Sequence, residues 1–393
     1  MLEQFFAFQY WQIDENRRDN DLLRNLIVRN KNKLDKQNLD KIAAKRKKQQ
    51  EKSFAFYDTE VLFLEQKFKH SLRQKLPTRW ADLQELSDNL DVTYILKKIK
   101  YACNIVNREQ LYNSKHKVGL LQEVLQHIEV EKWHEKNDAI QLYYACFQML
   151  QSNEASKAEQ FLILLQEKGD ILSKTELASL YDFTLVFYNR QNVKQYDKML
   201  DIYFFRLENN LLQDGKFLHY IHLYNLLILA LKLQQFDLVE TLAISYKKQI
   251  EPEFVKVFYH FSMGKSAFYQ KKYQEASKHF ECIESSKILY ELDRRTHLLK
   301  TYFLNNEISL FDSRKNSFRQ FLRTNKAISK QIKKQYESFI KFLDSLYKKK
   351  DLRNKADKSK LLRLQQKIAT ETMREGKWLL QEIEKCLNKK FKT

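Results

Sequence analysis

The 393-residue chain contains very little glycine and proline, 5 and 2 residues respectively. β-Sandwiches, barrels and βαβ units need frequent tight turns, and these two residues supply most of them. Their scarcity excludes such folds and predicts a chain that is nearly all helix. Hydrophobic residues make up 43% of the sequence, with 27 Phe, 21 Tyr and 4 Trp, so a large core can form and global disorder is not expected.

The few glycines are also widely separated, at positions 119, 169, 215, 264 and 376. Phosphate-binding loops need several neighbouring glycines, because the backbone must approach the phosphates closely. Their spacing excludes the P-loop and the G-x-G-x-x-G pattern. The sequence also contains no G-x-S-x-G elbow and no H-E-x-x-H helix, which are the signatures of large enzyme classes. We therefore expect a protein that is not an enzyme and has no cofactor.

The four cysteines, at positions 103, 146, 282 and 386, form no C-x-x-C pair and have no histidine at a zinc-ligand spacing. They are predicted to be reduced, buried thiols. Glu281 and Glu284 flank one of them and could act as acid and base. On a helix of this composition they are expected to point to solvent, because carboxylates are rarely buried without a partner.

His219 and His222 lie three residues apart and could face one side of a helix. Two metal ligands sometimes have this spacing, but no third ligand stands at a suitable distance along the chain. Tyrosines and leucines surround the pair. Interior or interface histidines are the simpler interpretation, and no metal site is predicted.

Long apolar runs are missing as well. The segment Tyr220–Leu233 is the longest, but it contains His222, Asn225 and Lys232 and is shorter than the roughly 20 residues that span a bilayer. The apolar start, Met1–Trp11, lacks the positive residues and the cleavage site of a signal peptide. These observations predict a cytoplasmic protein without a transmembrane segment.

Positive charge is in excess and unevenly distributed. The net charge is +20; residues 1–50 contain 12 Lys and Arg against 7 Asp and Glu, and residues 312–393 contain 24 against 9. The segment between them is therefore neutral. A basic end could bind nucleic acid, an acidic protein or an anionic membrane surface. A solvated, lysine-rich helical face is the alternative interpretation.

The most informative pattern lies in residues 261–280. Gly264 and Ala276 are 12 residues apart, and Phe280 follows Ala276 by one helical turn. Two antiparallel helices approach closely only where small residues stand at their crossing, and a bulky residue one turn later fills the space beside it. This segment resembles a tetratricopeptide repeat. The resemblance implies an α-solenoid that binds other proteins.

The same spacing recurs in earlier segments. The matching triplets are Cys146, Ala158 and Leu162; Thr184, Tyr196 and Leu200; and Leu227, Val239 and Ala243. Successive second positions are 38, 43 and 37 residues apart, which exceeds the repeat's period of about 34 residues. We predict an all-α fold, an irregular α-solenoid of antiparallel helix pairs with extra helices at both ends.

The chain as a whole also resembles a group of uncharacterised bacterial tetratricopeptide-like proteins. The segments that carry this resemblance are Ile99–Arg108, Ile140–Tyr144 and Lys377–Leu380. Such proteins have no assigned activity, so the resemblance implies a helical-repeat fold and nothing about chemistry.

Three regions are predicted along the chain. Residues 1–90 form a helical region with a basic segment at 31–52, residues 91–311 form the repeat array, and residues 312–393 form a basic, helical capping region. A last helix pair is expected at Thr296–Leu304 and Ile308–Leu322, followed by helices at Ile328–Leu346 and Leu361–Leu387. A closing helix is expected because a terminal repeat must cover the apolar face of its neighbour.

Four aromatic residues share one position of the repeat, three residues before the first residue of each matching set. They are Tyr143, Tyr181, Tyr224 and Phe261. In tetratricopeptide-like arrays this position resembles one that lines the concave groove, so the rings could bind an extended peptide or a partner helix. Packing between repeats is the alternative interpretation.

Two functions follow as hypotheses. The first is a non-catalytic scaffold that binds another protein in the groove of the array. The second is association with nucleic acid, whose phosphates would be bound by the basic region after Asp312.

Overall fold

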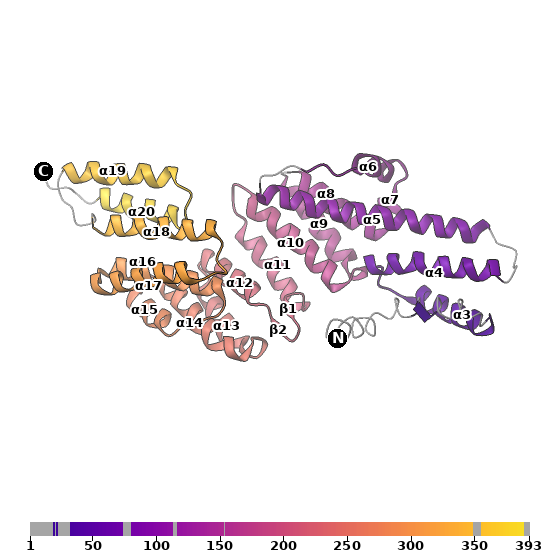
Figure 1. Ribbon diagram of the computed structural model, residues 1–393, viewed down its shortest axis with the longest axis horizontal. Helices are drawn as coiled ribbons and strands as arrows, with labels where there is room; N and C mark the ends of the chain where they lie inside the picture. Colours follow the sequence, from indigo (N-terminus) through magenta and orange to yellow (C-terminus); the bar gives the residue numbers. More distant parts are fainter. Residues whose placement is uncertain are drawn as a thin grey trace. The chain divides into compact units, whose positions relative to one another are not determined.

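The computed structural model describes residues 19, 21–22, 32–73, 80–112, 116–152, 154–348 and 355–388. The apolar start of the chain lies outside these residues. Within them the chain is helical apart from one short β-hairpin (Figure 1), which confirms the all-α prediction. The chain divides into two compact units, Met1–Leu212 and Gln213–Thr393. The three-region division at residues 90 and 311 stays a prediction.

The first unit contains nine α-helices and one 3₁₀ turn among its described residues. They are α3 (Asn32–Lys48), α4 (Phe54–Arg73), α5 (Trp80–Tyr112), α6 (Leu121–Val130), α7 (Trp133–Lys136), α8 (Asp138–Gln151), α9 (Ala155–Lys168), η1 (Gly169–Ile171), α10 (Lys174–Arg190) and α11 (Tyr196–Glu208).

The second unit begins with two strands and continues with helices. They are β1 (Gln213–Asp214), β2 (Phe217–Leu218), α12 (Tyr220–Lys232), α13 (Phe236–Ser245), η2 (Lys247–Gln249), α14 (Pro252–Tyr269), α15 (Tyr273–Glu281), α16 (Ile288–Asn305), α17 (Ile308–Thr324), α18 (Lys330–Tyr347), α19 (Lys355–Thr370) and α20 (Gly376–Asn388).

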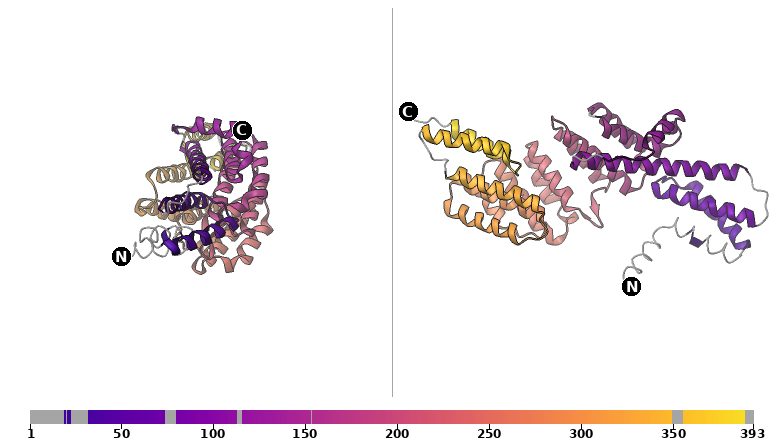
Figure 2. Two further views of the ribbon diagram at one scale, coloured as in Figure 1. Left: turned by 90° about the vertical axis from the view of Figure 1, so that its right-hand side faces the viewer. Right: turned by 45° about the horizontal axis from the view of Figure 1, so that its top comes forward.

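Helix α5 organises the first unit. It contacts α4, α6 and α8, and α4 and α5 lie side by side in both views (Figures 1 and 2). Its residues Ile95, Ile99, Ala102 and Cys103 are buried because they recur at three- and four-residue intervals and so share one face of the helix. The Cys103 thiol lies 3.7 Å from the backbone oxygen of Tyr143 on α8.

Helix ends follow local sequence signals. Ser173 and Glu176 form a capping box at the start of α10, in which each side chain binds the backbone N–H of the other residue. The Ser329 hydroxyl accepts a bond from the backbone N–H of Ile332 at the start of α18. Pro252 opens α14, where its missing N–H costs nothing.

The hairpin at the start of the second unit pairs Asp214 with Phe217. Gly215 has φ +63°, a left-handed conformation that glycine adopts without steric cost. Glycine is therefore favoured at this turn.

Helix pairs account for the predicted repeat spacing. The first residue of each matching set lies on α8, α10, α12 or α14, and the second lies on the next helix, α9, α11, α13 or α15. Each of these pairs is in contact. The small residues Ala158 and Ala276 are fully buried, as close helix crossings require. The predicted pair at 296–322 is also confirmed, as α16 and α17.

The C-terminal prediction was wrong in one respect. Leu361–Leu387 was expected to form one helix, but the chain forms two, α19 and α20. Glu375, the residue before α20, has φ +60°, which no helix can contain. α18, α19 and α20 contact one another and form a group of three helices at the end of the second unit (Figure 2).

The longest apolar run predicted from the sequence lies in α12, where Leu223, Leu226 and Leu227 are buried. Among the described residues, no helix is both long enough and apolar enough to cross a membrane.

Candidate functional site

Tyr143, the first of the four predicted groove residues, is buried on α8. Its hydroxyl donates to the Glu176 carboxylate at 3.2 Å. The backbone N–H of Phe54 donates to the same carboxylate at 3.0 Å, and the Lys100 ammonium lies 3.9 Å from it. Burial, followed by the charge of Glu176, raises the pKa of Tyr143 far above its usual value. Tyr143 thus belongs to a buried junction of α4, α5, α8 and α10.

Tyr181, on α10, is also buried, and its ring centroid lies 5.2 Å from that of Phe205. Its hydroxyl has no hydrogen-bond partner among the described residues. Nearby, the buried Arg206 donates from Nη1 to Asp182 Oδ1 at 2.7 Å. The ring is therefore a packing element between α10 and α11.

Tyr224 and Phe261 lie in the second unit and contact each other, with ring centroids 5.9 Å apart. Phe261 is fully buried and its ring lies 4.6 Å from that of Tyr290. The Tyr224 hydroxyl donates to Asp293 at 2.9 Å. The contacts of all four predicted residues are thus those of helix packing, the alternative interpretation, and partner binding by these rings stays a prediction.

His219 and His222 do not form a metal site with a third ligand. His219 Nδ1 accepts the backbone N–H of Ile221 at 3.3 Å and so caps α12. The two rings lie 5.8 Å apart, edge to face. No group of three His, Cys, Asp or Glu side chains in the described part of the chain is placed to hold a metal.

The cysteine prediction is confirmed in part. Cys103 and Cys146 are free and buried, whereas Cys282 is exposed and Cys386 is only partly buried, so the expectation of burial was wrong for these two. Cys282 follows directly after α15. Its position at the end of a helix explains its exposure.

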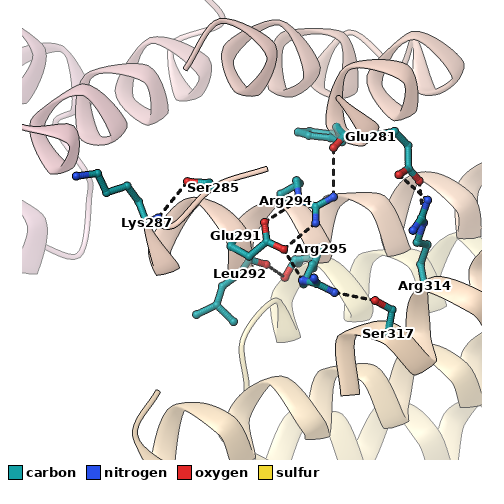
Figure 3. A network of polar contacts seen from close by, with 11 residues as sticks. Glu281, Ser285, Lys287, Glu291, Leu292, Arg294, Arg295, Arg314 and Ser317 are labelled. Carbon is teal, nitrogen blue, oxygen red and sulfur yellow. Dashed lines mark hydrogen bonds and ion pairs between the residues drawn. The ribbon is translucent and has the colours of Figure 1, made fainter. Parts of the chain in front are cut away.

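Glu281, which was expected to point to solvent, is engaged instead. Its carboxylate accepts two bonds from Arg314, at 2.6 and 2.8 Å (Figure 3). It also accepts one from the Tyr302 hydroxyl at 2.7 Å. These contacts join α15 to α16 and α17. A carboxylate that accepts two hydrogen bonds from one arginine stabilises the packing of the helices that it joins. These contacts indicate no acid–base role for Glu281.

Two arginines surround another carboxylate, that of Glu291 on α16. Arg294 donates to both of its carboxylate oxygens, at 2.7 and 2.9 Å, and Arg295 donates at 2.6 Å. Arg295 also reaches Ser317 on α17 at 3.0 Å (Figure 3). Burial opposes ionisation of Glu291, but the two guanidinium groups outweigh it and lower its pKa.

A cluster of buried charges lies between α14 and α16. The Lys265 ammonium donates to Asp293 at 2.8 Å and lies 3.3 Å from His297 Nε2. His297 Nδ1 lies 2.7 Å from Asp293 Oδ1. Burial, reinforced by the charge of Lys265, lowers the pKa of His297. A neutral ring that donates from Nδ1 to Asp293 and accepts at Nε2 from Lys265 satisfies all three groups.

The same network extends to the C-terminal helices. The Lys300 ammonium pairs with Glu375, which immediately precedes α20, and lies 4.8 Å from the ring centroid of Trp378. Burial lowers the pKa of Lys300 despite the carboxylate beside it. Lys300 is buried, whereas Glu375 and Trp378 are partly exposed. These contacts hold the start of α20 against α16.

One concave feature of the first unit is a groove of about 560 Å³ between α6, α8 and α9, which we call the glutamine groove. Residues from all three helices line it. They are Gln122, Leu125, Gln126, Glu129, Tyr144, Phe147, Gln148, Gln151, Ser152, Glu154 and Lys157.

The floor of the glutamine groove is apolar and its walls are amide-rich. Phe147 and Tyr144 are buried beneath it. The Tyr144 hydroxyl donates to Glu129, and burial together with that carboxylate raises the pKa of Tyr144 to about 12. Gln122 and Gln126 are exposed, and their amides have no hydrogen-bond partner among the described residues. Amides of this kind offer both donors and acceptors.

Sequence reasoning missed the glutamine groove. One of its walls is α6, which precedes the first helix pair of the predicted repeat, and glutamine on a helix carries no periodic signal. Comparison with protein family models, with curated proteins and with solved structures finds no match. The resemblance to tetratricopeptide arrays therefore rests on the helix pairs and on the residues at their crossings.

Proposed function

We propose that this protein is a non-catalytic scaffold that binds an extended segment of another protein in the glutamine groove. The observation that carries the proposal is a groove with an apolar floor and unpaired side-chain amides on its walls. An extended peptide presents alternating N–H and C=O groups at its edge. Glutamine amides can pair with both kinds of group, whereas a catalytic site needs titratable groups that converge.

The same proposal includes the arrangement of the helix pairs as an irregular α-solenoid. Its support is the contact of each helix with the next, from α12 through α17.

Peptide binding can be tested without knowing the natural partner. A library of short random peptides is selected on the full chain, and the affinity of the enriched peptides is measured by fluorescence anisotropy. Replacing Gln122 and Gln126 by alanine should weaken binding about tenfold or more, since each hydrogen bond contributes about 0.5–1.5 kcal/mol.

The matched control is the Gln160→Ala/Gln166→Ala variant. These two glutamines are exposed on α9 and do not line the groove. The control should bind the peptides as the wild-type chain does. Equal loss in both variants, or no loss in either, would refute the assignment of the groove.

A further inference from the structure

A second groove, of about 410 Å³, lies between α18 and α19 in the C-terminal group of helices. We call it the basic groove. Its lining residues are Lys341, Phe342, Ser345, Lys360, Arg363, Leu364, Lys367, Thr370 and Glu371. The lining thus contains four cations and a single carboxylate, which accepts a bond from the Ser338 hydroxyl.

The cations of the basic groove stand on both of its walls. Lys341 comes from α18, and Lys360, Arg363 and Lys367 come from α19. The three on α19 are separated by three and four residues, so they share one face. At a rise of 1.5 Å per residue they extend over about 10 Å of the helix. A line of positive charge therefore follows the groove.

These charges are largely uncompensated. Lys341, Arg363 and Lys367 are exposed, and none of them is in an ion pair among the described residues. Elsewhere in the second unit, cations such as Lys315 have carboxylate partners, here Asp312 and Asp344. Unpaired cations in a concave site raise the local concentration of anions.

We infer that the basic groove binds the sugar–phosphate backbone of a nucleic acid, without reading its bases. Phosphate contacts need positive charge and little else. Tight binding to a protein or a membrane generally uses exposed apolar anchors, but the large apolar residues of this groove, Phe342 and Leu364, are buried. No exposed aromatic ring lines the groove, so stacking on bases is not expected. This inference is independent of the glutamine groove.

The test measures the affinity of the full-length chain for a duplex DNA and a duplex RNA by fluorescence anisotropy at several salt concentrations. Four phosphate contacts should weaken DNA binding about 100-fold between about 50 and 200 mM salt. The Lys341→Gln/Arg363→Gln/Lys367→Gln variant should bind weakly, with a logarithmic salt slope reduced by about 0.9 for each cation removed.

The control variant, Lys232→Gln/Lys247→Gln/Lys248→Gln, removes the same charge from exposed positions outside the groove. It should retain the wild-type affinity and slope. Absence of binding at low salt, or equal losses in both variants, would overturn the inference. Tighter binding of polyglutamate, or of phosphatidylserine vesicles, than of either duplex at equal salt would overturn it too.

Discussion

The ring of Phe280 occupies the space that a side chain on Gly264 would need. A Cβ atom built on Gly264 would lie 2.9 Å from Phe280 Cε1 and 3.2 Å from the Cβ of His279. Phe280 is fully buried, so its ring cannot move into solvent. The glycine is therefore required by the close approach of α14 and α15.

Gly264→Ala should destabilise the protein. Overpacking a buried contact costs about 1–3 kcal/mol, against a gain of up to about 1 kcal/mol in helix propensity. Urea denaturation measures the difference. Gly119→Ala is the control, because a Cβ at that position would meet nothing within 4 Å. Equal midpoints for both variants would show that the crossing is not tight.

Asp293→Asn should destabilise the protein strongly, although asparagine has nearly the same shape as aspartate. It removes the charge that faces the buried ammonium of Lys265, and breaking a buried ion pair costs about 3–5 kcal/mol. Asp201→Asn is a matched control, since Asp201 is exposed and has no ion pair among the described residues. Chemical denaturation should separate the two variants clearly; similar curves would contradict the predicted role of the buried pair.

Acid should weaken the contact between α14 and α15. His260 Nδ1 and His279 Nδ1 are 3.1 Å apart, and burial lowers the pKa of both rings, with Lys256 acting in the same direction on His260 and Glu275 opposing it on His279. Below about pH 6.5 the unfolded chain binds these protons more readily than the folded chain. Stability should therefore fall as the pH decreases.

The measurement is the thermal midpoint between about pH 7 and pH 5. His279→Gln should flatten the dependence, since it removes one titrating group and also the charge that repels a protonated His260, on which only Lys256 still acts. Some dependence should remain, because the pKa of the buried His297 is also lowered. If the thermal midpoint of the variant changed with pH as steeply as that of the wild-type chain, His260 and His279 could not be the source of the pH dependence.

Glu176→Gln should loosen the junction around Tyr143. The carboxylate accepts bonds from Phe54 N–H, the Tyr143 hydroxyl and the Ser173 hydroxyl, and hydrogen bonds to a charged group contribute about 1.5–3 kcal/mol. Amide hydrogen exchange at Phe54 should become faster than in Glu167→Gln, which changes an exposed carboxylate on α9. Unchanged exchange at Phe54 would contradict the junction.

The sequence predicted the packing correctly where only one kind of residue permits a given arrangement of helices. Gly264 and Ala276 predicted a close crossing because only small residues permit one. The spacing of Ser173 and Glu176 also carried a signal, since a capping box can be read from sequence. It did not reveal that the Glu176 carboxylate would bind Phe54 and Tyr143, which depends on how distant helices meet.

The burial of charged residues was not predicted from the sequence. Lys265 and Lys300 look like surface residues in sequence, yet both are buried, because their partners Asp293 and Glu375 are 28 and 75 residues away. The break at Glu375 was missed for a related reason. A positive φ at a non-glycine residue cannot be predicted from the residue type. Here the residue with the positive φ, Glu375, is also the partner of Lys300.

The pair between Lys300 and Glu375 also sets an order of events during synthesis. The lysine leaves the ribosome 75 residues before its carboxylate partner, and until then its ammonium can be buried on α16 only at a high energetic cost. Domains fold as units while the chain is made. The packing around Lys300 should therefore be completed only after the last helices have been translated, and a ribosome stalled before Glu375 should hold a second unit that proteases cleave readily.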